Sequence, residues 1–223
     1  MLGRSFIPFV RSDLFFGVNS KDSSPNMLDG EWTEDSINVY SNPAGALSSR
    51  PGFSQLTSAS TGSSAAWTGF YQFDKHSSGS TTSYFIGGCS NGKFYNFAGT
   101  SFTELFSGLT TGLNYLWSFM TLDNTVVAVN GVDGPLSWGG TGSATTFATT
   151  CTGDFCLEWQ RYGWIHSTVD PRLMYYSVLG NPDSPYTTFL NFDMDMEKVT
   201  GACKQGDDML VGKNTNLYRV QDR

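Results

Sequence analysis

Three carboxylates at residues 193 to 197 have a spacing that could bind a metal ion. In "NFDMDMEK", Asp193, Asp195 and Glu197 occupy alternate positions, and on a β-strand this period places all three side chains on one face. Divalent cations take oxygen ligands, so a cation site is one hypothesis. The segment lacks the glycine and asparagine turn chemistry of a dedicated calcium loop. We therefore favour a solvated strand face or loop and predict no metal.

A second acidic group lies in "LDGEWTEDSINVYSNPAGALSSRPGF", residues 28–53, and consists of Asp29, Glu31, Glu34 and Asp35. The same stretch contains Arg50, which could pair with one of these acids. Nothing nearby supplies a general base, a nucleophile or a convincing metal geometry. Asn42-Pro43 and Arg50-Pro51-Gly52 are turn sequences. The stretch is therefore predicted to be an extended segment entering a β domain, not a catalytic loop.

Only two histidines are available as acid–base groups. His76 lies in the polar segment "FDKHSSGS", where an exposed loop histidine is expected. His166, in "YGWIHST", alternates with apolar neighbours on a predicted strand, and a half-buried, hydrogen-bonded histidine is expected there unless a carboxylate partners it. No GxSxG, HExxH, Walker or GxGxxG motif occurs. We predict no catalytic residue, no cofactor and a protein that is not an enzyme.

The four cysteines are spaced 62, 5 and 47 residues apart. They form no CxxC pair and have no nearby histidine pair, so the spacing does not support a zinc site. Buried thiols are the first expectation. A disulfide between Cys151 and Cys156 is the alternative, and it depends on an oxidising compartment.

Aromatic side chains are the other residues that could form a site. They gather in two places, Trp67, Phe70, Tyr71 and Phe73, and then Trp159, Tyr162 and Trp164. Such groups can form a platform for a carbohydrate or peptide. In a repeat of small sheets, however, large aromatics usually fill the interfaces between sheets, and this is the prediction for most of them.

The charge balance disfavours nucleic-acid binding. Lys and Arg number 13 and Asp and Glu number 20, which gives a net charge of 13 − 20 = −7. Such a chain repels phosphates instead of binding them. No window of about 18 apolar residues occurs, and Arg4, Pro8, Arg11 and Asp13 interrupt the N-terminal sequence before a signal-peptide core develops. We expect a soluble protein without membrane insertion or a cleaved signal.

The composition indicates an all-β protein. Aromatic residues make up 15% of the chain, and glycine, serine and threonine are abundant. Charged residues also make up 15%, against roughly 25% in typical soluble domains, which indicates a surface that is either rich in Ser, Thr, Asn and Gly or covered by partners. Three regions are predicted: an N-terminal arm or docking segment at 1–53, a flexible Ser/Thr-rich linker at 54–66, and a repeat β domain at 67–223.

Four segments of the last region share one pattern: an apolar strand, a polar turn and a second strand with an aromatic residue. They are "SYFIGGCSNGKFYNF", "NTVVAVNGVDGPLSW", "YGWIHSTVDPRLMYYS" and "DMLVGKNTNLYRV". Aligned after the turn, their anchors are Phe94, Leu136, Leu173 and Leu217, separated by 42, 37 and 44 residues. A further strand is predicted after the first three segments, in "TSFTELF", "ATTFATT" and "TTFLNF".

A period of about 40–45 residues with several short strands per unit is typical of β-propeller blades, which cover one another's faces by stacking. We predict a β-propeller-like fold of about four blade-like units, partial or open, with an extended N-terminal arm. The fourth unit ends without outer strands, so either the arm completes it or neighbouring subunits close the propeller. A β-sandwich or barrel with similar hairpins is the alternative.

Three segments resemble bacteriophage tail proteins of the nozzle or tail-tubular type. They are "DGEWTEDSINVY" with "PAGAL" and "RPGF", then "RLMYYSVLGNPDSPYTTF", and then "VTGACKQGDDMLVGKNTNLYRV". They cover the first fifty residues and roughly the last sixty, while the middle matches by repeat period. This chain is much shorter than usual members of that group and ends where further blades would follow.

The resemblance implies a structural virion protein, assembled in the host cytoplasm and located in the tail. It implies a homo-oligomeric ring that contacts other tail or adaptor proteins and lets DNA pass without binding it specifically. An acidic conduit and a lightly charged surface agree with that role. The assembly contacts would then lie in the arm, at Asp29, Glu31, Glu34, Asp35 and Arg50. A carbohydrate- or receptor-binding β module is the alternative, and a propeller-type hydrolase ranks last.

Overall fold

The computed structural model describes residues 60–61, 65–147, 151–192 and 197–221, and the backbone of four short strands before residue 50. The chain divides into two compact units, Met1–Gln55 and Leu56–Arg223. In the first unit, β1 (Gly17–Val18) pairs with β2 (Trp32–Thr33) in parallel, and β3 (Val39–Ser41) pairs with β4 (Leu47–Ser49) antiparallel. The predicted contacts of the arm lie outside the described residues, namely Asp29, Glu31, Glu34, Asp35 and Arg50.

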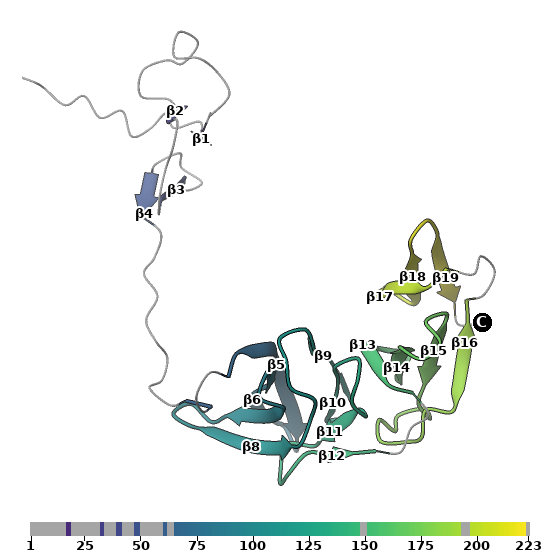
Figure 1. The fold of residues 1–223 in the computed structure, drawn as a ribbon, viewed down its shortest axis with the longest axis horizontal. Coiled ribbons are helices and arrows are strands. Elements are labelled where there is room, and N and C mark those ends of the chain that lie inside the picture. Colours follow the sequence, from purple (N-terminus) through teal and green to yellow (C-terminus); the bar gives the residue numbers. More distant parts are fainter. Residues whose placement is uncertain are drawn as a thin grey trace, which may run out of the picture. The chain divides into compact units, whose positions relative to one another are not determined.

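The second unit consists of antiparallel sheets, each made of strands that follow one another in the chain (Figure 1). The first sheet contains β5 (Trp67–Ser77), β6 (Ser80–Cys89), β7 (Lys93–Phe97) and β8 (Phe102–Ser107). The second contains β9 (Ser118–Leu122), β10 (Thr125–Val129), β11 (Leu136–Trp138) and β12 (Thr145–Thr146). The third contains β13 (Gly153–Trp159), β14 (Tyr162–Ser167), β15 (Leu173–Tyr176) and β16 (Thr188–Asn191). The fourth contains β17 (Val199–Gln205), β18 (Asp208–Lys213) and β19 (Leu217–Gln221).

The predicted repeat is confirmed strand by strand. Each of the four predicted hairpins forms the second and third strands of one sheet, and the anchors Phe94, Leu136, Leu173 and Leu217 all lie on third strands. The strands predicted after the first three hairpins are β8, β12 and β16. The first strand of each sheet was not part of the predicted pattern. The repeat unit is therefore a four-stranded meander, of which the sequence pattern detected the later strands.

Two-residue turns join the first and second strands in every sheet of the second unit. Three of them have positive φ at both central positions, Ser78-Gly79, Asp123-Asn124 and Gln160-Arg161. This is the backbone of a type I′ turn, whose twist matches that of a hairpin. In the fourth sheet the turn begins at Gly206, which has a φ of 60°. The four sheets therefore share one local geometry at this end.

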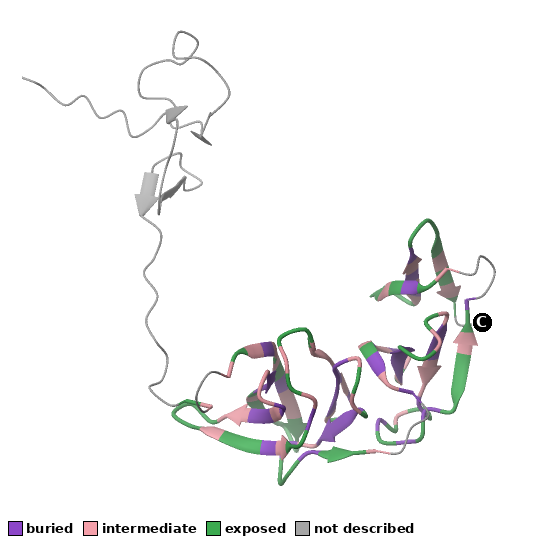
Figure 2. Ribbon diagram, in the orientation of Figure 1, coloured by how far each residue is buried: buried purple, intermediate pink, exposed green. Residues whose placement is uncertain are grey.

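Three buried clusters hold neighbouring sheets together. The cluster between the first and second sheets includes Phe73, Ile86 and Trp138. The next contains Met120, Val127 and Ile165, and the last joins Trp164 and Met174 to Met209 and Val211 of the fourth sheet. Each sheet thus covers a face of the one before it. In Figure 2 the outer strands β8, β12 and β16 are mostly exposed, as their burial patterns also show.

A pair of glycines makes room for an indole between the first two sheets. Gly69 on β5 is paired with Gly88 on β6. A Cβ at Gly88 would lie 1.9 Å from the Nε1 of Trp117, and one at Gly69 would lie 2.6 Å from the Cβ of that tryptophan. Trp117 precedes β9 and packs against the cluster between the first and second sheets. These glycines are required by close packing and not by backbone conformation.

Candidate functional site

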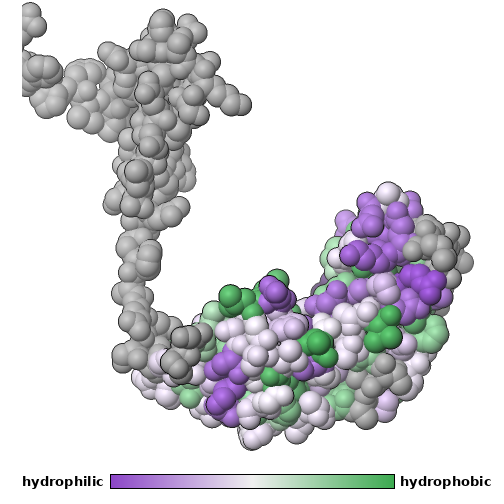
Figure 3. Space-filling view, viewed as in Figure 1, coloured by the Kyte–Doolittle hydropathy of each residue, from purple (hydrophilic) through white to green (hydrophobic). Residues whose placement is uncertain are grey.

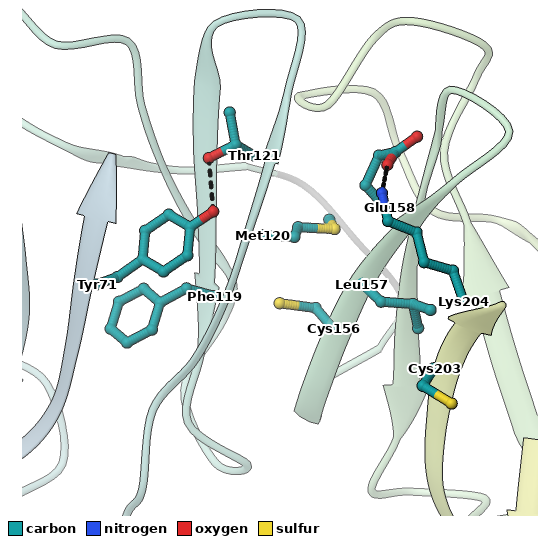
Figure 4. Close-up of a pocket in the computed structure, with 9 residues that line it drawn as sticks. All are labelled: Tyr71, Phe119, Met120, Thr121, Cys156, Leu157, Glu158, Cys203 and Lys204. Atoms are coloured by element: carbon teal, nitrogen blue, oxygen red, sulfur yellow. Dashed lines mark hydrogen bonds and ion pairs between the residues drawn. The ribbon is translucent and has the colours of Figure 1, made fainter. Parts of the chain in front are cut away.

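The first strands of all four sheets meet around one pocket of about 250 Å³. In Figure 4 its lining residues come from β5, β9, β13 and β17, and the side chain of Cys203 points away from β13. They are Tyr71, Phe119, Met120, Thr121, Cys156, Leu157, Glu158, Cys203 and Lys204. We call this the first-strand pocket. These strands are far apart in the chain and meet here only because the sheets pack in series.

The first-strand pocket combines an apolar wall with two polar contacts. Tyr71 stacks on Phe119 with ring centroids 5.3 Å apart, and its hydroxyl lies 2.9 Å from the Oγ1 of Thr121. Lys204 donates from Nζ to Glu158 Oε2 over 2.6 Å, which joins the fourth sheet to the third. This ion pair is partly solvent-exposed, so it contributes little to stability. The wall resembles a packed interface more than a site that binds one small molecule.

Cys156 is a nucleophile type in this pocket, but its environment suppresses its reactivity. Burial raises the pKa of the Cys156 thiol to about 12, and a hydrogen bond with Ser118 opposes this only in part. The reactive form of a cysteine is the thiolate, which is scarce at neutral pH when the pKa is so high. Cys156 therefore acts as a core residue between the second and third sheets.

His166 has the carboxylate partner that would make it a candidate base. It is 3% exposed, so it is buried where a half-buried side chain was expected, and its Nδ1 lies 2.5 Å from Asp154 Oδ1. Its Nε2 lies 3.0 Å from the carbonyl oxygen of Pro171, and its ring stacks on Phe155. Both nitrogens are thus engaged within the protein, and neither is directed at a nucleophile. The residue ties β13, β14 and the loop before β15 together.

The pairing with His166 changes the pKa of Asp154. Partial burial acts to raise the pKa of Asp154, but the hydrogen bond and the charge of His166 outweigh it and lower that pKa below its ordinary value. A pocket of about 280 Å³ lies beside the pair and is also lined by Thr168, Lys198 and Thr200. It opens between the third sheet and the segment that begins β17.

The remaining predicted positions have mixed outcomes. His76 is exposed as predicted, but it lies on β5 and not in a loop, with Nδ1 2.8 Å from Thr81 Oγ1. Asp193 and Asp195 lie outside the described residues. Glu197 accepts hydrogen bonds from the backbone N and the Oγ1 of Thr215. Within the described residues, no group of three or more His, Cys, Asp or Glu side chains could hold a metal ion.

The prediction of buried thiols holds for three of the four cysteines. Cys89, Cys151 and Cys156 are buried, and none of the four is in a disulfide in the described part of the chain. For Cys203 the prediction was wrong, because it is exposed. It lies on β17, on the face of the fourth sheet that points away from the third. The described segments contain no helix long and apolar enough to cross a membrane.

Most large aromatics fill the interfaces between sheets, as predicted. Trp159 is 6% and Trp164 is 4% exposed, and both lie in the cluster between the third and fourth sheets. Phe73 is fully buried between the first two sheets. Phe70 and Trp67 are exceptions, because both lie on the outer face of the first sheet, with ring centroids 4.1 Å apart, and Phe70 is 55% exposed. Only the packing distinguishes these positions, since all of them are aromatic residues on strands.

The ties between neighbouring hairpin turns were missed by the sequence analysis. Asp123, in the turn after β9, pairs with Arg161, in the turn after β13, over 3.1 Å. Asn124 Oδ1 accepts from the backbone N of His76 over 2.8 Å. The strand–turn–strand pattern of "TLDNTVVAV" was the available signal. These contacts connect the same end of successive sheets.

Together these features define an all-β, propeller-like protein. Its sheets are four-stranded or three-stranded meanders stacked in chain order, and their first strands adjoin one another. A sandwich would instead have two sheets facing each other across one core. Here three clusters separate four sheets in series. The predicted fold class is therefore confirmed and the sandwich alternative is wrong.

No protein-family model and no curated protein sequence matches the chain. Among solved structures, it is similar to BBS1N from a complex with ARL6DN, with 9% identity and a TM-score of 0.49 over 77% of this chain. The computationally designed Ika4 protein has 13% identity and a TM-score of 0.46, covering 76% of this chain and 98% of that one. BamB from Moraxella catarrhalis has 11% identity and a TM-score of 0.43, covering 63% of this chain and 42% of that one. The match spans about half of the BBS1N chain, 54%.

Proposed function

We propose that the protein is a structural, non-enzymatic component of a bacteriophage tail, where copies of the chain assemble into a ring around the path of the DNA. The observation that carries the proposal is a pair of exposed aromatic side chains on the outer face of the first sheet. Phe70 and Phe85, on the face of the first sheet that points away from the second, are 55% and 47% exposed. Contiguous exposed apolar groups of this kind mark interaction surfaces.

The residues behind the resemblance to tail proteins have structural roles, which supports a structural function. In "YSVLGNPDSPY", Ser177 Oγ accepts from the backbone N of Gly163, and Ser184 Oγ accepts from the backbone N of Val178. Tyr186 is fully buried in the cluster between the second and third sheets. The motif therefore specifies a compact loop that seals an interface.

The charge of the chain suits the proposed role. A net charge of −7 repels the phosphates of DNA that must slide past the ring. The cores of protein interfaces are poor in charged residues. Much of the surface in Figure 3 is neither strongly hydrophilic nor strongly hydrophobic, and hydrophilic side chains gather over β17–β19. DNA would thus pass the protein without specific binding.

Two measurements test the proposal. Light scattering on the purified chain should give a mass that is a multiple of the 24.4 kDa subunit. Labelled antibodies should decorate the tails of particles of the phage whose genome encodes the chain. A chain that is monomeric at every concentration and absent from purified particles would contradict the proposal.

A carbohydrate-binding module is a second candidate, favoured by a pocket on the first sheet. This pocket of about 500 Å³ is lined by Ser83, Tyr84, Phe85, Asn96, Phe97, Ala98 and Gly99. Aromatic faces beside an asparagine amide suit a sugar ring. A glycan array should then show binding that Phe85→Ala abolishes. Trp159 is a poor reporter for this test because it is buried.

A further inference from the structure

Equivalent positions of the first strands point toward the next sheet. Lys75, two residues before the end of β5, donates from Nζ to the carbonyl oxygen of Gly139 in the second sheet over 2.6 Å. Met120, two residues before the end of β9, lies in the cluster shared with the third sheet. Leu157, two residues before the end of β13, packs against the cluster shared with the fourth. Cys203 holds the same position on β17 and is exposed.

The preceding positions point toward the previous sheet. Three residues before the strand ends, Phe119 packs toward the first sheet, Cys156 toward the second and Ala202 toward the third. Asp74 holds this position on β5, and no described sheet precedes the first in the second unit. We call this alternation of the two positions the stacking rule. Among the described sheets of the second unit, it leaves the first sheet without an earlier neighbour and the fourth without a later one. Asp74 on β5 and Cys203 on β17 are the residues at these two positions.

The free face of the first sheet is aromatic. The strand register puts Phe70 and Phe85 on this face, together with Tyr95, Phe97 and Phe102. Tyr95 is only 5% exposed, and its hydroxyl donates to the carbonyl oxygen of Thr61 over 3.0 Å, so the segment at residues 60–61 covers that part of the face. The ring of Trp67 covers part of it, with its centroid 4.1 Å from that of Phe70 and 5.2 Å from that of Phe102. Phe70 and Phe85 remain about half exposed.

The free face of the fourth sheet is mixed. Its register places Cys203, Leu210 and Arg219 in one row, and Leu217 beside Gly212 in the next. Leu217 is 69% exposed. Arg219 and Asp208 neutralise each other at 2.6 Å on the same face. The face thus offers leucines and a paired charge, a combination of apolar and polar groups that is usual at protein interfaces.

Polar contacts between neighbouring hairpin turns are a second kind of contact that repeats from sheet to sheet. His76 is bonded to Asn124, Arg161 is bonded to Asp123, and Gln160 Nε2 donates to the carbonyl oxygen of Asp207 over 3.3 Å. Every pair of neighbouring sheets in the unit therefore combines an apolar cluster with a tie between turns. A further sheet on either end can make both contacts by the same pattern.

We propose that a second copy of this chain packs against both end sheets of the unit. The fourth sheet of each copy would cover the aromatic face of the first sheet of the other copy. This contact would continue the series of three interfaces already present in the unit, because it joins faces of the same two kinds. Two head-to-tail contacts close a ring when the rotation between the copies is half a turn, whereas rotations that do not close give a filament. Four sheets per copy give eight in the ring, within the range of about 4–8 blades found in closed propellers. The inference rests on the self-assembly in the proposed function, but not on the virion location.

A cysteine cross-link tests the contact directly. The stacking rule sets Asp74 of one copy opposite Cys203 of the other, so Asp74→Cys should form an intermolecular disulfide with the native Cys203 under diamide. The matched control is Val169→Cys, at a position that is 78% exposed but on neither free face. We expect a cross-linked dimer with the first variant, with mass spectrometry finding the peptide that joins the introduced thiol to Cys203, and none with the control. Failure to cross-link, with both thiols still reactive, would overturn the inference.

Charge substitutions provide a second, independent test. Phe85→Glu and Leu217→Glu each place an unpaired carboxylate in the proposed contact, and should weaken self-association about 30-fold or more, as loss of a hot spot does. Val169→Glu is the control and should associate like the unmodified chain. Circular dichroism of each variant verifies that the sheets remain folded. Unchanged association of both face variants would contradict the contact.

The outcomes separate this inference from the proposed function. A stable oligomer of Asp74→Cys without the cross-link to Cys203 overturns the inference and leaves the ring function standing. A cross-linked dimer of a chain that is absent from phage particles supports the inference and contradicts the function. A monomer whose Phe85 is protected from oxidative footprinting shows that the face is covered by the chain's own residues or another ligand, which also overturns the inference.

Discussion

Substitution of Gly88 by alanine is expected to weaken the packing of the first two sheets. The added Cβ would lie 1.9 Å from Nε1 of Trp117 and 2.4 Å from its Cδ1 and Cε2. Real atoms do not approach so closely, so the indole must move. The strand cannot yield easily, because Gly88 is paired with Gly69 on one side and with Phe94 on the other.

The expected cost follows from two effects. Overpacking in a core costs typically about 1–3 kcal/mol. Moving the indole also weakens its contacts with Phe94 and Phe119, whose ring centroids lie 5.5 and 6.3 Å away. Full loss of a buried tryptophan costs about 3–5 kcal/mol, and Trp117 is only partly buried. We expect Gly88→Ala to lower the free energy of unfolding by about 3 kcal/mol.

A double-mutant cycle with Trp117→Ala isolates the clash. Once the indole is absent, Gly88→Ala should cost close to nothing. Gly134→Ala is the matched control, since nothing lies within 4 Å of its Cβ position, and it should change stability by no more than about 0.5 kcal/mol. Urea unfolding followed by far-UV circular dichroism gives all of these values. Equal effects of Gly88→Ala and Gly134→Ala, or strict additivity with Trp117→Ala, would refute the reasoning.

Three further predictions concern stability at acid pH, thiol reactivity and the buried cluster between the third and fourth sheets. The folded-state pKa of Asp154 is lowered, so the carboxylate contributes stability that is present above its unfolded pKa of about 3.9 and is lost as the pH falls through the folded value. Asp154→Asn should therefore reduce the fall of the thermal-denaturation midpoint at acid pH. An unchanged fall would contradict the pairing with His166. Cys203 is exposed while the other cysteines are buried, so one thiol should react quickly with Ellman's reagent in the native chain and four after denaturation, and two or more fast thiols would contradict the packing. Met209→Ala, at a fully buried position between the third and fourth sheets, should cost about 2–5 kcal/mol in urea unfolding, whereas a cost near zero would mean that the fourth sheet is not docked.

Local patterns explain how far the sequence could predict this fold. Alternating apolar residues and turn pairs are short-range signals, and they located the second and third strands of every sheet in the second unit, including those with Phe94 and Leu217. The first strands escaped because they form the contacts between sheets and follow no simple apolar alternation, as in β13, where buried and half-buried positions are mixed. The second strands were easier to find where they are continuous apolar runs, such as β10, which is buried at four of its five positions.

The candidate site could be anticipated only in part. The roles of His166 and the large aromatics depend on neighbours brought close by packing, such as Asp154 on the adjacent strand. The same holds for the exposure of Cys203, which follows from its face of the fourth sheet and not from its neighbours in sequence.

The sequence by itself determined the β class, the repeat and the turns, because strand and turn preferences act over a few residues. Only the tertiary structure decided which face of each strand is covered. Phe73 and Phe70 are both phenylalanines on β5, three residues apart, yet one is fully buried and the other is 55% exposed. The difference arises because the second sheet covers only one face of the first, and the stacking of whole sheets is a long-range property that no local pattern encodes.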